Sequence, residues 1–119
     1  MVTALVQFPL PASVTREAAI GLFKGSAPRY RDMPGLIRKY YVLGEDGRGG
    51  GIYLWKSREA AERVYDAVWR TMIKERYGAE PVITYFDTPV IVDNTTGEIS
   101  VDARAGSRRH VRRGLRRLS

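Results

Sequence analysis

Apolar residues recur along the chain with two different periods, which separate strands from helices. Alternating positions predict strands, and positions three or four apart predict helices. The predicted elements are, in order, a strand at Val2–Phe8, a helix that begins at Ser13 or Thr15 and ends or breaks at Gly25 and Pro28, a strand at Leu36–Leu43, a strand at Ile52–Trp55, one helix from Ser57 to near Tyr77, and a strand at Val82–Val92. This βαββαβ order predicts an α+β fold of the ferredoxin-like kind, with an antiparallel sheet.

The stretch Gly49–Ser57 is the one around which the other elements are arranged. Its apolar run Ile52–Trp55 is unbroken, so both faces of the strand should be covered, which predicts an interior position in the sheet. Ser57 can cap the following helix with its hydroxyl, and Glu59 places a negative charge near the positive helix end.

The two predicted helices each have an apolar side. The expected buried positions are Ala18, Ala19, Leu22 and Phe23 in the first helix, and Ala61, Val64, Tyr65, Val68 and Met72 in the second. The glycine-rich segment Gly44–Gly51 joins two strands, so it is predicted to be a hairpin loop with its turn at Asp46 and Gly47. Phosphate-binding glycine motifs open a helix, and this one does not.

The predicted strands are apolar on both of their faces, which has a consequence for assembly. Two helices can cover one face of a four-stranded sheet, yet Leu36–Leu43 and Ile52–Trp55 place apolar or aromatic side chains on both. An uncovered apolar face favours association. We therefore predict a homodimer that packs sheet against sheet.

The net charge of +7 comes from the end of the chain. Residues 1–103 hold equal numbers of acidic and basic residues, and the segment from Arg104 to Arg117 supplies seven arginines and no acid. The sequence thus predicts one domain at 1–94 and a C-terminal extension at 95–119 with an arginine-rich amphipathic tail. Nucleic acid or an anionic surface is expected as a partner only through this tail, which we expect to be disordered unless it finds one.

Cysteine is absent, so disulfides and thiolate chemistry are excluded. The first ten residues lack the basic region of a signal peptide, and no apolar run is long enough to span a membrane. These features predict a cytoplasmic protein without a transmembrane segment.

Three short motifs carry a resemblance to a known family. Pro34–Lys39, Gly50–Trp55 and Phe86–Val90, in this order around two helices, resemble the YdhR-like group of proposed mono-oxygenases. These belong to the dimeric α/β-barrel superfamily, which includes the mono-oxygenases of antibiotic biosynthesis. The similarity covers about residues 1–94. It implies an apolar pocket between the sheet and its helices, and oxidation of a small aromatic or polyketide-like substrate by dioxygen without a cofactor.

The distribution of chemical groups limits the reactions that the domain could perform. The single histidine, His110, lies in the basic tail, so the domain has no histidine base or ligand. A Ser-His-Asp triad cannot form, and the haem-degrading relatives, which use a histidine ligand, match poorly. The acids fall at positions expected to face solvent, so we expect no metal site.

The remaining candidates are an aromatic cavity and two possible bases. The residues expected to bind substrate are Tyr41, Tyr53, Trp55, Tyr65, Trp69 and Phe86. Lys39, with a lowered pKa, or Asp87, with a raised one, could deprotonate a phenol. The competing interpretations are that the aromatics form core or dimer interface, that Lys39 reaches solvent, and that Asp87 caps a turn before Pro89. A non-catalytic small-molecule-binding or regulatory dimer is the alternative function, since it needs the same pocket.

Overall fold

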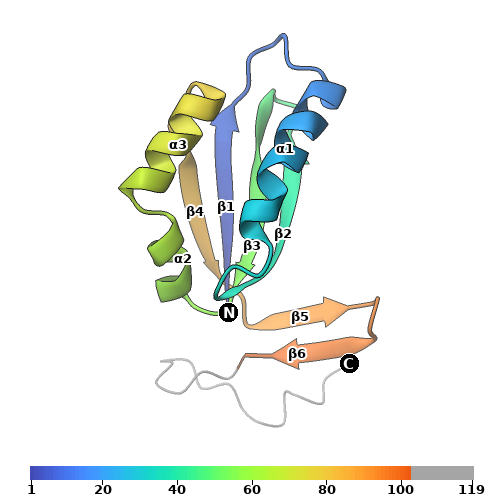
Figure 1. The fold of residues 1–119 in the computed structure, drawn as a ribbon. Coiled ribbons are helices and arrows are strands. Elements are labelled where there is room, and N and C mark those ends of the chain that lie inside the picture. Colours follow the sequence, from blue (N-terminus) through green and yellow to red (C-terminus); the bar gives the residue numbers. More distant parts are fainter. Residues whose placement is uncertain (103–119) are drawn as a thin grey trace.

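The computed structural model describes residues 1–102 (Figure 1). The elements are β1 (Val2–Pro9), α1 (Arg16–Tyr30), β2 (Leu36–Leu43), β3 (Arg48–Trp55), α2 (Arg58–Val64), α3 (Ala67–Tyr77), β4 (Val82–Asp87), β5 (Val90–Asp93) and β6 (Glu98–Val101). β1 to β4 form an antiparallel sheet in the order β2-β3-β1-β4, and all three helices lie on one face of it. The predicted ferredoxin-like α+β fold is confirmed.

β1 lies inside the sheet and shows how the helices cover one face. Val2, Ala4, Val6 and Phe8 are buried beneath the helices, while the residues between them are only half-buried. β1 pairs with β3 on one side and β4 on the other, and β3 also pairs with β2. The interior position predicted for the third strand is therefore confirmed.

The predicted loop Gly44–Gly51 is too long, because β3 already begins at Arg48. Gly47 makes the expected turn with a φ of 84°, but Gly49, Gly50 and Gly51 pair with Phe8, Gln7 and Val6 of β1. A Cβ built on Gly50 would lie 1.8 Å from the Val6 carbonyl oxygen. The glycines are needed in the strand because neighbouring atoms approach its backbone closely.

Helix α1 continues through Gly25 and Pro28, where an end or a break was predicted. Thr15 is its cap, and its hydroxyl accepts a hydrogen bond from the Ala18 N–H at 3.1 Å. The last residue, Tyr30, is 7 % exposed and packs in the core. Glycine and proline disfavour a helix interior by about 1 and 3 kcal/mol, so the burial of this last turn outweighs their cost.

The single helix predicted after Ser57 is two helices. Ser57 caps α2 as expected, but the chain turns at Tyr65, and Asp66 caps α3 by accepting from the Trp69 N–H at 2.9 Å. The turn changes which side is buried: Trp69 lies in the core, while Val68, expected there, is 78 % exposed. The Asp66 cap thus starts a second helix, although the apolar residues of the sequence continue at the spacing of a single helix.

The strand predicted at Val82–Val92 is also two strands. β4 ends at Asp87, and β5 leaves the sheet after Pro89 to pair with β6. We call this β5–β6 hairpin, residues 90–101, the hairpin arm; it projects from the end of the sheet (Figure 1). The boundary predicted after residue 94 falls in its turn and stays a prediction. The arm is fixed at its base, where Thr88 N–H donates to the Met1 carbonyl at 2.9 Å and the Met1 ammonium pairs with Asp102.

Within residues 1–102, no element covers the sheet face away from the helices, and we call it the open face. Its apolar side chains, assigned by strand register, are Leu5, Tyr40, Val42, Ile52, Leu54, Val82 and Phe86. Phe86 is 49 % and Tyr40 53 % exposed. The predicted apolar open face is thus present, whereas its cover by a second copy remains to be tested.

Among residues 1–102, no helix is long and apolar enough to cross a membrane. The arginine-rich tail and His110 lie outside the described residues, so the statements about them stay predictions.

Candidate functional site

Lys39, on the edge strand β2, lies among three tyrosine rings. Its Nζ is 3.5 Å from the centre of the Tyr30 ring, 3.8 Å from that of Tyr41 and 4.5 Å from that of Tyr53. The rings come from three elements: the end of α1, the same strand β2, and the neighbouring strand β3. The Lys39 side chain therefore turns beneath the helices, and does not extend freely into solvent.

Strand register and one glycine make this arrangement possible. An irregularity between Leu36 and Arg38 shifts the register, so Lys39 pairs with Tyr53 and Tyr41 pairs with Gly51. A Cβ on Gly51 would lie 3.1 Å from Lys39 Cε and 2.8 Å from a ring carbon of Tyr53. The missing side chain of Gly51 thus leaves the space that the Lys39 stem occupies.

These residues line a small space between the sheet and helices α1 and α3, which we call the Lys39 cavity. It is walled by aromatic rings and by Gly50 and Gly51, and α1 and α3 add three polar side chains, Ser26, Arg29 and Arg76. Its volume is about 20 Å³, which is room for about one water molecule. Pockets for small organic ligands usually measure about 300–1,000 Å³. An aromatic ligand could enter only if lining side chains moved outward.

Burial lowers the pKa of Lys39 to about 6, because the ammonium form loses its hydration. The three ring faces act in the opposite direction, since they attract a cation. Among the described residues, Lys39 makes no ion pair or hydrogen bond with a carboxylate that would hold its proton. Near pH 7 the amine is therefore largely neutral, which is the form that can accept a proton.

Tyr41 and Tyr53 remain protonated over the same range. Burial raises the pKa of Tyr41 and of Tyr53 above the usual 10. The Tyr41 hydroxyl is 2.7 Å from Ser26 Oγ, so the two share a hydrogen bond. These phenols can donate hydrogen bonds to a ligand, and Lys39 is the side chain of the cavity whose pKa is lowered toward neutral pH.

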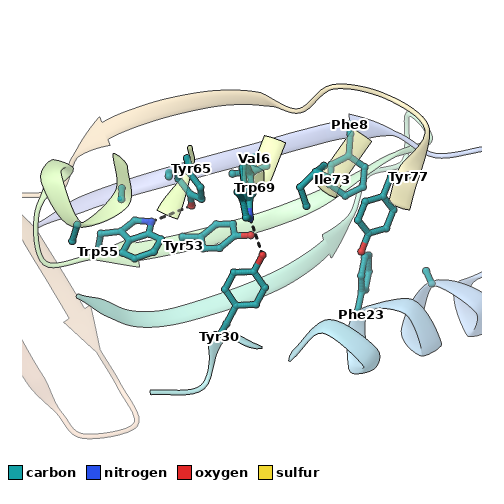
Figure 2. Close-up of a cluster of buried hydrophobic side chains, with 14 residues drawn as sticks. Val6, Phe8, Phe23, Tyr30, Tyr53, Trp55, Tyr65, Trp69, Ile73 and Tyr77 are labelled. Atoms are coloured by element: carbon teal, nitrogen blue, oxygen red, sulfur yellow. Dashed lines mark hydrogen bonds between the residues drawn. The ribbon is translucent and has the colours of Figure 1, made fainter. Parts of the chain in front are cut away.

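Trp55, Tyr65 and Trp69 form a packed aromatic layer beside the cavity (Figure 2). Trp55 Nε1–H donates to the Tyr65 hydroxyl at 3.1 Å, and Trp69 Nε1–H donates to the Tyr30 hydroxyl at 2.9 Å. None of the three lines the cavity. The first hydrogen bond pairs the polar atoms of Trp55 and Tyr65 and orients the two rings. The second holds the ring of Tyr30 over Lys39 Nζ.

The structure does not bring the other two predicted site residues to this cavity. Phe86 pairs with Thr3 and points to the open face. Asp87 is the exposed last residue of β4, at the end of the sheet. Of the predicted site residues, Lys39, Tyr41 and Tyr53 line the cavity together, whereas Asp87 does not line it.

Sequence reasoning missed Tyr30 and Gly51. Tyr30 continues the helical series of Ala19 and Phe23, so the periodicity could have found it if Pro28 had not been taken as a helix end. Gly51 was assigned to a loop, and its role depends on the path of the Lys39 side chain, which no sequence pattern reports. Within residues 1–102 there is also no group of three histidine or acidic residues placed to hold a metal ion.

No protein-family model and no curated protein matches the chain. Solved structures do match it. A candidate antibiotic biosynthesis monooxygenase from Deinococcus radiodurans is 13 % identical with a TM-score of 0.60, covering 78 % of this chain and 97 % of that one. A monooxygenase from the gene ActVA-Orf6 of Streptomyces coelicolor, in complex with nanaomycin D, is 21 % identical with a TM-score of 0.56, covering 73 % and 86 %. SnoaB, a cofactor-independent oxygenase from Streptomyces nogalater, is 15 % identical with a TM-score of 0.55, covering 73 % and 91 %.

At these identities the similarity establishes the fold, which is the ferredoxin-like fold of the antibiotic biosynthesis monooxygenases. The narrower resemblance to YdhR-like proteins stays a prediction. Activity has to be argued from the site.

Proposed function

We propose that the protein is a cofactor-independent mono-oxygenase that oxidises an aromatic or polyketide-like phenol with dioxygen. The observation that carries this proposal is Lys39, a partly buried amine with a pKa lowered to about 6, which lies among three tyrosine rings and has no carboxylate partner within residues 1–102. The fold supports it, because two proteins of the same fold are named as a monooxygenase in complex with nanaomycin D and as a cofactor-independent oxygenase.

In the proposed reaction, Lys39 Nζ removes a proton from the substrate, and the negative charge spreads over the aromatic rings of the substrate. The electron-rich carbon transfers electrons to dioxygen and forms a C–O bond, and the resulting peroxide takes the proton back from the Lys39 ammonium. Loss of water from this hydroperoxide leaves a carbonyl, so that a methylene group and dioxygen give a ketone and water. The aromatic walls hold the carbanion away from bulk water, and the tyrosine hydroxyls supply hydrogen bonds.

Substrate entry requires the cavity to open. Phe23, Met72 and Arg76 wall the cavity from the helix side, and Arg76 is held across α1 by a 2.9 Å hydrogen bond to the Leu22 carbonyl. We expect these side chains to move outward when a planar substrate binds.

We also propose that the protein is a homodimer whose open faces pack against each other. The exposed apolar residues of that face support this, as does the hairpin arm, where Val90 and Val92 are also exposed. The Arg38 guanidinium, on the open face, lies 3.3 Å from Asp93 of the arm, so the arm and the face can form one continuous interface. Phe86 would then lie in the interface.

The direct test is oxygen consumption with a panel of anthrones and quinols, without added flavin or iron. The Lys39→Met variant should lose turnover by at least about 100-fold, the usual contribution of a general base. Lys56→Met is the matched control, because Lys56 is an exposed lysine and should be dispensable. Strict dependence on added flavin or iron, or unchanged turnover in Lys39→Met, would contradict the proposal.

The alternative is a non-catalytic binding or regulatory dimer, which would use the same cavity. A protein of this kind would bind the same aromatic compounds without oxygen uptake. Calorimetric binding combined with the oxygen electrode separates the two functions.

A further inference from the structure

A surface groove lies on the outer side of the Lys39 cavity, between the end of α1 and the edge strand β2. Its volume is about 360 Å³, within the range of pockets for small organic ligands. Among residues 1–102, no strand pairs with β2 on this side of the sheet, and the groove opens to the surface. Tyr30, Lys39 and Tyr41 line both the groove and the cavity. The Lys39 side chain therefore stands at the junction of the groove and the cavity.

We propose that Lys39 is also a nucleophile, which condenses with an aromatic aldehyde or ketone entering from this groove to form an imine. The inference uses the amine to attack carbon, whereas the proposed oxygenase uses it to remove a proton. It requires neither dioxygen nor opening of the inner cavity.

The surroundings of Nζ suit each stage of this reaction. Attack needs the lone pair of a neutral amine, and Lys39 has no carboxylate partner among residues 1–102 to keep it protonated. The other charged side chains that line the two spaces are mostly cationic: Arg29, Arg31, Arg38 and Arg76, with Asp32 as the acid. A protonated imine is a cation, and the rings of Tyr30, Tyr41 and Tyr53 already surround the position of its nitrogen.

The condensation is balanced without an oxidant. The Nζ lone pair forms a bond to the carbonyl carbon, and the carbonyl oxygen takes up a proton to give a carbinolamine. The C–O bond then breaks, and the hydroxyl leaves as water with a proton from nitrogen. A C=N bond remains between Lys39 and the carbonyl compound, and hydrolysis reverses it.

The test is reductive trapping of the imine with benzaldehyde and sodium cyanoborohydride at pH 7, in deoxygenated buffer. Peptide mapping by mass spectrometry then reports modification at each of the four lysines, Lys24, Lys39, Lys56 and Lys74. We expect benzylation of Lys39 to be at least about tenfold faster than that of Lys56, since an ordinary lysine is almost fully protonated at this pH. The excess should disappear in urea, where the rings no longer surround the amine.

Two variants complete the test. Lys39→Arg keeps a long nitrogen-bearing side chain beside the rings but cannot form the imine, so fast modification should vanish, whereas Lys56→Arg should leave modification of Lys39 unchanged. Equal rates at Lys39 and Lys56 in the wild-type protein, or modification of Lys39 only after unfolding, would overturn the inference, even if Lys39→Arg failed to fold. Trapping at Lys39 without oxygen uptake would uphold this inference and reject the oxygenase. Oxygen uptake that depends on Lys39, without trapping at Lys39, would uphold the oxygenase and reject this inference.

Discussion

The two faces of the sheet have similar apolar composition but very different surroundings. On the covered face, Val6 and Trp55 are almost completely buried, and the rings form hydrogen-bonded pairs. On the open face, Ile52 and Phe86 remain exposed although they belong to the same strands or to neighbouring ones. The covered face is thus stabilised within one chain and holds the Lys39 side chain. Within residues 1–102 the open face has no such cover, so we expect a second copy of the chain to pack against it.

Removal of the large ring of Trp55 should have the largest effect on the covered face. Trp55→Ala deletes a side chain that is 0 % exposed and leaves the Tyr65 hydroxyl without its donor. We expect a loss of about 3–5 kcal/mol in the free energy of unfolding, measured by urea titration. A loss below about 1 kcal/mol would mean that this core is not packed as described. Val68→Ala, on the exposed side of α3, should change stability by less than about 0.5 kcal/mol.

Charges on the open face should act on association more than on folding. Ile52→Lys and Phe86→Lys place ammonium groups where a second sheet would pack, so we expect a monomer with an unchanged far-UV spectrum. Sedimentation velocity at micromolar concentration measures the outcome. Val68→Lys adds the same charge on the helix side and should leave the dimer intact. A wild-type protein that is monomeric under these conditions would contradict the proposed interface.

A methyl group at Gly51 should disturb the Lys39 cavity selectively. In Gly51→Ala the new Cβ would contact Lys39 Cε and the ring of Tyr53, and we expect a loss of about 1–3 kcal/mol in the free energy of unfolding, because this space is already filled. Gly21→Ala is the matched control, since its Cβ meets no atom within 4 Å in helix α1 and should stabilise the protein by about 0.5–1 kcal/mol. Equal effects of the two variants in chemical denaturation would show that Gly51 is not required for space.

The stability of the protein should rise with pH between about 6 and 9. In the folded state the pKa of Lys39 is lowered to about 6, while in the unfolded chain it is near 10.4, so the unfolded state binds more protons in this interval. Where the folded state is mostly deprotonated and the unfolded state mostly protonated, the slope should approach the limit of about 1.4 kcal/mol per pH unit for one proton, and the attraction of the ring faces for the ammonium acts by narrowing this pH interval. Above pH 10 the trend reverses, since burial raises the pKa of Tyr53. Lys39→Met should remove the rise, and an equal slope in both proteins would exclude Lys39 as its source.

Much of the fold could be predicted because it depends on local patterns. The alternation of apolar residues in β1 and the Ser57 cap could be predicted from the sequence, and Thr15 was one of two predicted caps for α1. The errors arose where packing between distant residues decides the structure. Burial of Tyr30 stabilises the last turn of α1 beyond Pro28. The close approach of the Val6 carbonyl oxygen to β3 requires a glycine at position 50 of the strand.

The candidate site was predicted in part for the same reason. Lys39, Tyr41 and Tyr53 were expected to act together, and their alternation on paired strands brings them to one face. Phe86 lies on the opposite face because the register of β4 against β1 places it beside Thr3, and that register is not written in the local sequence.

The charge state of Lys39 is the central claim, and NMR measures it directly. A titration of the Lys39 13Cε chemical shift, assigned by comparison with Lys39→Arg, should give a pKa near 6, while Lys56 serves as the internal reference. A pKa of 10 or above for Lys39 would show that the amine remains protonated among the tyrosine rings, and would contradict both its role as a base and its role as a nucleophile.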